Sequence, residues 1–166
     1  MIKSLNLMFP EIFLSLSIFS TLLIGVYIKK SFNLIFNLTS LIMIVTIAII
    51  LTSLNIEGKI FSNSFTRDAF SNYFKILILL SSLFVLNSSK SFIIDNKLNK
   101  FEYPIIVLLS ILGMFFMVSA NDLILFYLGL ELQSLSLYIL ASIDRDSLRS
   151  TESGIKYFVL SALSSG

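Results

Sequence analysis

The sequence predicts an all-α membrane protein, a polytopic bundle of about six transmembrane helices. Hydrophobic residues make up 56% of the chain and charged residues only 13%, and the mean hydropathy is +0.93, so the chain is far more apolar than an ordinary soluble domain. The charged residues cluster in short segments between apolar runs. These runs are long enough to cross a hydrocarbon core of about 30 Å.

Three of these helices are expected in residues 1–102, an amino-terminal membrane segment with loops. The first covers Ile12 to Ile28, and the second lies within Ser31 to Ile56, which contains no charge. Residues 55–68 are polar and have no sustained apolar periodicity, so they predict a loop. The third span follows this loop, and its uncharged core covers Ile76 to Ser89.

Two charged residues belong to these first spans. Glu11 stands at the start of the first helix, where a carboxylate favours the positive end of the helix dipole. Lys75 falls one turn inside the third span, where its long side chain can reach the membrane interface. We therefore interpret Lys75 as a snorkelling anchor.

Residues 103–166 are expected to form three more helices. The fourth covers Tyr103 to Ala120, the fifth Leu123 to Ile143, and a sixth starts near Ser150. Asp122 is a suitable cap for the fifth helix, and the short reversal before it predicts that the fourth and fifth spans are antiparallel neighbours. Charged loops are expected at residues 90–102 and 142–151.

The fifth span carries one charged residue, Glu131, near its middle. At about 1.5 Å per residue, Glu131 lies about 13 Å from the start of the run, close to the midplane of the membrane. A charge there costs roughly 2.5–3.5 kcal/mol, so an ionisable residue at this depth is by default a functional candidate. The alternative is a neutral glutamic acid that only fixes helix packing.

Helical spacing extends this candidate site along one face of the span. Tyr127, Glu131, Ser134 and Tyr138 follow one another at intervals of three or four residues, which predicts a narrow polar stripe that faces protein. Lys156 is a second ionisable residue, about two turns inside the sixth helix. It is interpretable either as a snorkelling lysine or as a group whose pKa is tuned for proton relay.

The composition also excludes several kinds of site. The chain has no cysteine and no histidine, so iron–sulfur, disulfide, zinc and histidine-ligated haem chemistry are unavailable to it. A net charge of +2 does not suggest nucleic-acid binding. The loops between spans carry three basic residues on the amino-terminal side and seven on the other, which predicts an outside amino terminus. These are Lys3, Lys59 and Arg67 against Lys29, Lys30, Lys90, Lys97, Lys100, Arg145 and Arg149.

The stretch from Ser119 to Gly166 also resembles a known family. It contains SANDL, LGLELQSLSLY, RDSLRSTESGIKYF and SALSSG in order, and it is similar to chain 2 of the proton-pumping NADH:ubiquinone oxidoreductase, respiratory complex I, and to its bacterial homologues. Upstream, FTRDAFSNYFKILILL resembles the third span of that family, including the lysine at position 75.

This resemblance implies a proton-translocating, antiporter-like membrane subunit that is an enzyme only as part of the complex. The essential fifth-helix glutamate of the family corresponds to Glu131, and its sixth-helix lysine corresponds to Lys156. NADH, flavin, iron–sulfur clusters and ubiquinone would be bound by other subunits and none by this chain. Residues 103–166 would be the start of the first of two inverted repeats, which they leave incomplete.

Two departures from the family keep other interpretations open. Leu130 stands where the wider superfamily often has a tryptophan. The alternatives to a proton-translocating subunit of complex I are a cation/proton antiporter subunit and a non-conducting membrane scaffold. A stand-alone channel is not expected. The family glutamate also works with a lysine on a seventh, broken helix that this sequence lacks, so we expect a split subunit whose second chain carries the remaining helices.

The expected surroundings follow from these inferences. The partners are other membrane-arm subunits, the second chain and membrane lipids, without nucleic acid. The abundance of Phe, Ile, Asn and Ser resembles AT-biased organellar coding, and it predicts the mitochondrial inner membrane with the amino terminus in the intermembrane space. A bacterial plasma membrane is the alternative.

Overall fold

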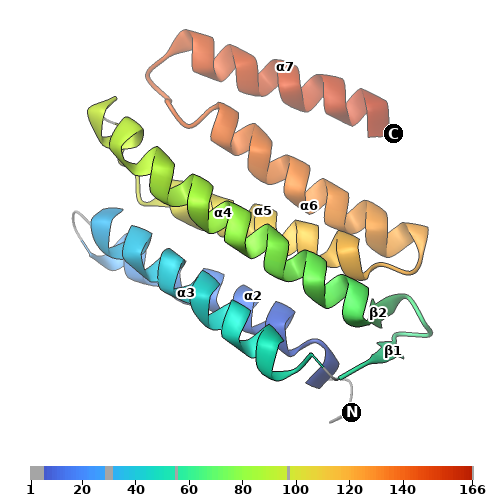
Figure 1. The fold of residues 1–166 in the computed structure, drawn as a ribbon. Helices are drawn as coiled ribbons and strands as arrows, with labels where there is room; N and C mark the ends of the chain where they lie inside the picture. The colour runs from blue at the N-terminus through green and yellow to red at the C-terminus, as the bar shows by residue number, and fades with distance from the viewer. Residues whose placement is uncertain (1–5, 29–31, 55, 97, 166) are drawn as a thin grey trace.

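The computed structural model describes residues 6–28, 32–54, 56–96 and 98–165. Within these ranges it is an all-α bundle with one short β-hairpin, as Figure 1 shows. The long helices are α2 (Phe9–Tyr27), α3 (Phe32–Thr52), α4 (Ala69–Asp95), α5 (Glu102–Ser119), α6 (Leu123–Ala141) and α7 (Leu148–Ser165). The all-α, polytopic architecture predicted from the sequence is confirmed.

The boundaries of α2 and α4 differ from the predicted ones. Helix α2 begins at Phe9, so Pro10 and Glu11 belong to its first turn. Helix α4 continues to Asp95, so the first residues of the predicted loop 90–102 are helical. In the described part of the chain, α2 to α6 are long and apolar enough to cross a membrane. Helix α7 has similar length but is more polar, and it carries Arg149, Glu152 and Lys156.

The loop predicted at residues 55–68 is instead a β-hairpin. Strand β1 (Gly58–Ile60) pairs antiparallel with β2 (Phe65–Arg67). The connection contains Phe61, Ser62 and Asn63, which have φ of 53°, 53° and 73°. These three residues adopt the left-handed conformation, which is uncommon for residues other than glycine. The turn therefore could not be recognised from the residue types in the sequence. The hairpin also contacts the α5–α6 turn, where the Asn121 amide N–H donates to the Ser64 carbonyl at 2.8 Å.

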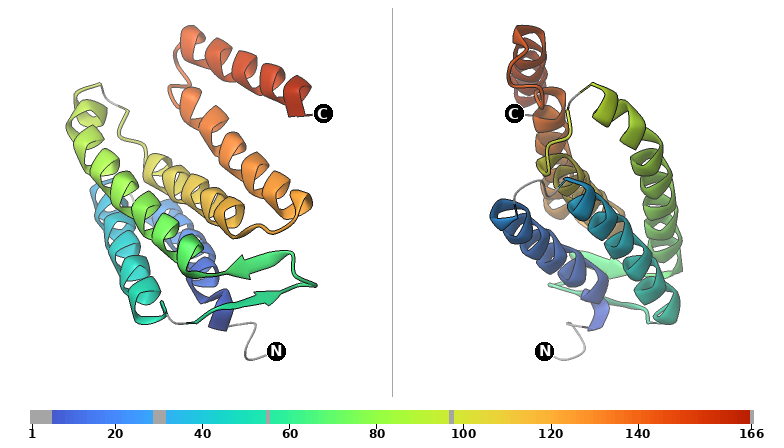
Figure 2. Two further views of the ribbon diagram at one scale, coloured as in Figure 1. Left: turned by 45° about the vertical axis from the view of Figure 1, so that its right-hand side comes forward. Right: turned by 90° about the vertical axis from the view of Figure 1, so that its left-hand side faces the viewer.

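Helix α5 is the centre of the bundle. It contacts α2, α3 and α4 on one side and α6 on the other, and α7 packs beyond α6 (Figure 2). Its buried Leu108, Ile111 and Phe115 join a core with residues of the first three long helices, such as Leu14 and Met43. By contrast, the buried residues of α6 are only Gly129, Ser136 and Tyr138, so most of α6 lies at the surface of the described chain.

Two glycines bring α5 and α6 into backbone contact. A Cβ atom on Gly113 would lie 2.7 Å from the Gln133 nitrogen and 2.8 Å from the Gly129 oxygen. A Cβ atom on Gly129 would lie 2.8 Å from the Met117 nitrogen. The absence of side chains at both positions allows this close approach, which is a common device where membrane helices pack together. The predicted antiparallel pairing of these two spans is confirmed.

The α5–α6 turn is held by the predicted cap. The Leu125 amide N–H donates to the Asp122 carboxylate at 2.8 Å, which satisfies one of the free donors at the start of α6. Hydrogen bonds from the Ser64 hydroxyl and from this amide hold the pKa of Asp122 below its usual value. The start of α6 is therefore tied both to its own cap and to the hairpin.

We expect Gly129→Ala to loosen α6 from α5. The new methyl group would meet backbone atoms that cannot rotate away, and overpacking of this kind costs about 1–3 kcal/mol. The measurement is the unfolding temperature of the detergent-purified protein. Gly58→Ala is the matched control, because its nearest neighbour is the flexible end of Leu7 at 3.0 Å. Equal unfolding temperatures for G129A and the unsubstituted protein would contradict the proposed contact.

Candidate functional site

Glu131 lies in the middle of α6, two residues after Gly129, which packs against α5. Its side chain is partly buried. Within the described residues its carboxylate has no ion pair and no hydrogen-bond donor. A carboxylate at this depth without a partner remains available to a proton or to a cation from outside the described chain.

The other residues of the predicted polar stripe do not gather around this carboxylate. The Ser134 hydroxyl donates to the backbone oxygen of Glu131 at 3.1 Å and thus stays within its own helix. Tyr127 is 44% exposed. The Tyr138 hydroxyl donates to Ser161 on α7, and the Tyr138 ring meets the Tyr157 ring edge-on at 4.8 Å. Tyr138 therefore joins α6 to α7, and the roles assigned to the stripe stay predictions.

Lys156 lies on α7 and pairs with a residue of its own helix, not with Glu131. Its ammonium forms an ion pair with Glu152 one turn earlier at 2.5 Å, and its side chain is 69% exposed. An exposed pair of this type contributes little to stability. The structure thus places the two predicted ionisable residues on adjacent helices without bringing them together.

A buried ion pair that the sequence analysis did not predict joins α2 and α4. The Lys75 ammonium donates to Glu11 Oε1 at 2.5 Å, and the two side chains are 0% and 1% exposed. The interpretation of Lys75 as a snorkelling anchor is therefore wrong. Its side chain points into the bundle because an opposite charge one helix away offsets part of the cost of burial.

Arg67 adds a third buried charge beside this pair. Its Nε donates to Asn72 at 3.1 Å, and its terminal nitrogens donate to Asn6 and Leu7 carbonyls and to Ser53. Burial lowers the pKa of Arg67 from its usual value, and the Glu11 carboxylate acts in the opposite direction. The guanidinium remains charged, because arginine is not deprotonated in proteins.

Aromatic rings enclose the ammonium of Lys75. It lies 5.4 Å from the centre of the Phe65 ring and 5.7 Å from that of Phe115, distances at which a ring face attracts a cation. Phe65 comes from β2 and Phe115 from α5, so the hairpin and the central helix both contribute to the site. The buried ion cluster, Glu11, Arg67 and Lys75, thus connects α2, β2 and α4 at one end of the bundle.

Only part of this ion cluster could have been found from sequence. Glu11 and Lys75 stand near the amino-terminal ends of the first and third spans. Consecutive spans alternate in direction, so these two spans run the same way, which would bring both charges to the same level of the membrane. Arg67 gave no such indication, because its burial depends on the hairpin that the sequence did not predict.

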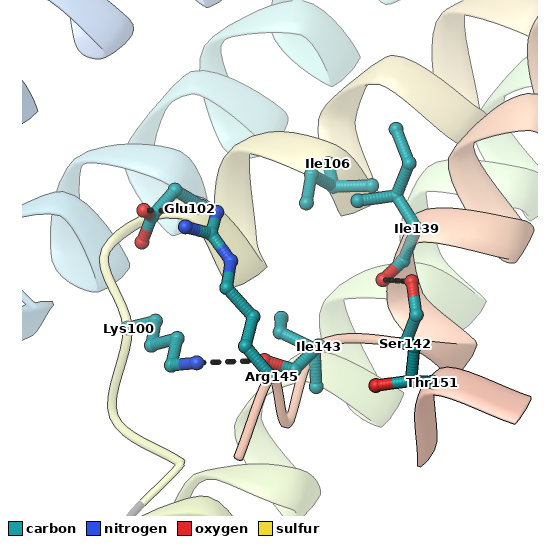
Figure 3. Close-up of a pocket in the computed structure, with 8 residues that line it drawn as sticks. All are labelled: Lys100, Glu102, Ile106, Ile139, Ser142, Ile143, Arg145 and Thr151. Carbon is teal, nitrogen blue, oxygen red and sulfur yellow. Dashed lines mark hydrogen bonds and ion pairs between the residues drawn. The ribbon is translucent and has the colours of Figure 1, made fainter. Parts of the chain in front are cut away.

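A surface recess lies at the other end of the bundle, between the loops around α5, α6 and α7 (Figure 3). It has a volume of about 340 Å³. The Lys100 ammonium donates to the Ile143 carbonyl at 2.8 Å, and the exposed Arg145 guanidinium lies 3.9 Å from Glu102. These contacts join the loop before α5 to the loop before α7.

Comparisons with known proteins indicate one family. A family model described as NADH:quinone oxidoreductase/Mrp antiporter, TM, matches residues 120–166. NADH-quinone oxidoreductase subunit N of Pelagibacter ubique is 50% identical over 164 residues, which are 98% of this chain and 35% of that protein. The protein of the same name from Bartonella bacilliformis is 47% identical over 99% of this chain and 34% of its own length.

A solved structure agrees with these similarities. A chain of respiratory complex I from Thermus thermophilus with bound aureothin superposes with a TM-score of 0.76 at 26% identity, covering 94% of this chain and 34% of that one. The chain thus spans about a third of the length of the relatives that it matches. The similarity extends over nearly the whole chain, including the segment from Ser119 to Gly166 and the third span with Lys75.

The buried ion pair predicts a strong dependence on both partners. We expect Lys75→Met to lower the stability of the purified protein by about 3–5 kcal/mol, because it leaves the Glu11 carboxylate without its cation. A chain that also carries Glu11→Gln should regain much of the loss. Unfolding temperatures in detergent measure both effects.

Lys156→Met is the matched control for stability, since its ion pair is exposed and should contribute at most about 1 kcal/mol. Equal losses for K75M and K156M, or additive losses for K75M and E11Q, would contradict a coupled buried pair.

Proposed function

Because the chain belongs to the family of antiporter-like membrane subunits of NADH-quinone oxidoreductase, we propose that it takes part in proton translocation as a non-redox subunit of that enzyme. The protein contributes ionisable groups within the membrane. Oxidation of NADH and reduction of the quinone, with the flavin and iron–sulfur clusters that they require, belong to other subunits. These other membrane subunits are its proposed partners.

The observation that carries this proposal is the unpaired carboxylate of Glu131 inside α6. The structure places it near the middle of a helix long enough to span the membrane, and no cation of the described chain pairs with it. Burying a carboxylate without a partner is costly. The cost falls when the group either binds a proton or receives a cation, and these two responses are the loading and release steps of a proton carrier.

The energy available from such a switch is sufficient for transport. Two unit charges 4 Å apart interact by about 4 kcal/mol at an effective dielectric constant of 20. When a cation approaches Glu131, the charged carboxylate is favoured and the proton leaves. When the cation withdraws, the carboxylate takes up a proton again. We propose that this cation comes from the two thirds of the related proteins that this chain does not span, or from a neighbouring subunit.

The packing of α6 suits this role. Its contact with α5 is fixed by the close approach at Gly113 and Gly129, whereas many of its other large apolar side chains are exposed in the described chain. Further helices are therefore needed to separate Glu131 from lipid. A non-conducting scaffold is the alternative function, and in that case Glu131 would serve only to hold those helices.

We propose the bacterial plasma membrane as the location, because the relatives named above are bacterial. The proposal replaces the mitochondrial location inferred from composition, and nothing in the comparisons supports the latter. In this orientation the end with the hairpin faces the outside, and the opposite end, with the α4–α5 and α6–α7 connections, faces the cytoplasm. Lys90, Lys100, Arg145 and Arg149 lie in or near these connections in the sequence, as the positive-inside rule predicts.

The function is tested by Glu131→Gln in the complete enzyme. The substitution keeps the size and hydrogen-bonding capacity of the side chain but removes ionisation, so we expect assembled enzyme that pumps fewer protons per NADH oxidised. Proton uptake and NADH oxidation are measured together in inside-out membrane vesicles. Glu102→Gln, at an exposed position, is the control. An unchanged proton-to-NADH ratio for E131Q would favour the scaffold.

The orientation is tested with single cysteines, because the chain has none of its own. Ser62→Cys lies in the exposed hairpin turn and Asp146→Cys in the exposed α6–α7 loop. A thiol reagent that does not cross membranes should label S62C in intact spheroplasts and D146C only after the membrane is opened or inverted. The reverse pattern would show that the proposed orientation is wrong.

A further inference from the structure

The recess between the ends of α5, α6 and α7 contains two cations with unused hydrogen-bond donors (Figure 3). The Lys100 ammonium has three N–H donors, of which the described residues use one, for the Ile143 carbonyl at 2.8 Å. The Arg145 guanidinium lies 3.9 Å from the Glu102 carboxylate, which is longer than a hydrogen bond. It has no hydrogen-bond acceptor in the described part of the chain. Both cations therefore keep donors for a ligand.

The two cations reach the recess from different loops. Lys100 precedes α5, whereas Arg145 lies between α6 and α7. Because Ile143 is two residues before Arg145, the bond from Lys100 holds its ammonium beside the loop that carries Arg145. The charged residues that line the recess, among those the structure describes, are Lys100, Arg145 and Glu102, so the recess has a net charge of +1. A basic pocket between membrane helices suits an anionic lipid headgroup.

The rest of the recess is apolar on the membrane side of these loops. Ile106 lies one turn inside α5, Ile139 lies in the last turn of α6, and both line the recess together with Ile143. The recess thus combines cations at the end of the bundle with an apolar wall that continues toward the membrane. A free phosphate ion would neutralise the cations but leave the apolar wall in contact with water, whereas an amphiphile covers both.

We infer that this recess binds an anionic phospholipid from the membrane leaflet at this end of the bundle. The phosphate accepts hydrogen bonds from Lys100 and Arg145, and its single negative charge offsets the net charge of the recess. The glycerol and the first carbons of the acyl chains lie against Ile106 and Ile139. The volume of about 340 Å³ is at the small end of the range for ligand sites, so the recess holds the headgroup while the acyl chains extend into the membrane.

A purely structural role accounts for only one of the two cations. The bond from Lys100 to the Ile143 carbonyl joins two loops and requires a single donor. The Arg145 side chain is 76% exposed, and a surface pair of this kind with Glu102 contributes little to stability. Neither the recess nor its ligand depends on the role proposed for Glu131.

The experiment uses the complete purified enzyme in phosphatidylcholine vesicles. These vesicles contain a small fraction of phosphatidylglycerol with a photoreactive group on its acyl chain, close to the glycerol. After illumination, mass spectrometry of the peptides identifies the labelled residues. We expect labels within residues 100–106 and 139–145. Arg145→Gln should lower this labelling about fivefold, the effect of one basic residue near an anionic lipid surface, and Lys100→Gln should lower it similarly.

Arg149→Gln is the matched control, because Arg149 is an exposed basic residue of the same region that is not among the residues lining the recess. Equal labelling of R145Q and R149Q would overturn the inference. Equal labelling by a phosphatidylcholine probe with the same photoreactive group would also overturn it, because it would show an apolar contact without recognition of charge. Absence of label from the recess would show that protein covers it, and this too would overturn the inference. E131Q should be labelled like the unsubstituted enzyme, so this result and the test of proton pumping fail or succeed separately.

Discussion

A charge buried among apolar helices has to be paired, and the arrangement of the first four long helices depends on how this chain pairs one lysine. The Lys75 ammonium on α4 reaches the Glu11 carboxylate on α2, and the rings of Phe65 from the hairpin and Phe115 from α5 lie beside it. The hairpin is held in place by Arg67, two residues after Phe65. The Arg67 guanidinium donates hydrogen bonds to the Leu7 carbonyl before α2, to the Ser53 carbonyl after α3 and to the Asn72 side chain on α4. One electrostatic requirement thus fixes the relative positions of several elements.

Glu131, the second charged position in the apolar helices, is not paired in this way. Glu131 has no partner in the described chain, although it lies on a helix whose contact with α5 is as close as backbone atoms permit. The rigid contact fixes the depth of the carboxylate, while its remaining surroundings are left open for other helices. Lys75 in the first four long helices is thus paired within the described chain, whereas Glu131 on the fifth is not, and we propose a role in proton transfer for Glu131.

Much of the fold could be predicted from the sequence because membrane spans are defined by length and apolarity alone. The cap at Asp122 and the antiparallel α5–α6 pair followed from a short turn and a capping residue, which are local features. The hairpin could not be predicted, because its strands are three residues long and its turn depends on three left-handed residues without glycine. The burial of Lys75 was missed for a related reason: a lysine near the end of a span has two low-energy solutions, snorkelling and pairing, and only the tertiary structure selects between them.

The position of Glu131 could be predicted because its depth depends on helix rise alone. Whether the residues of its stripe contact one another depends on which groups each side chain binds, and Tyr138 binds α7 instead.

The central claim is that Glu131 exchanges its proton under the control of an approaching cation. The most direct test is a structure of the complete membrane domain in lipid at a resolution that shows side chains and ordered water around Glu131. The account predicts a lysine ammonium or a chain of ordered water molecules against the carboxylate. A carboxylate enclosed only by lipid chains or apolar side chains, with neither a cation nor water within hydrogen-bond distance, would contradict it.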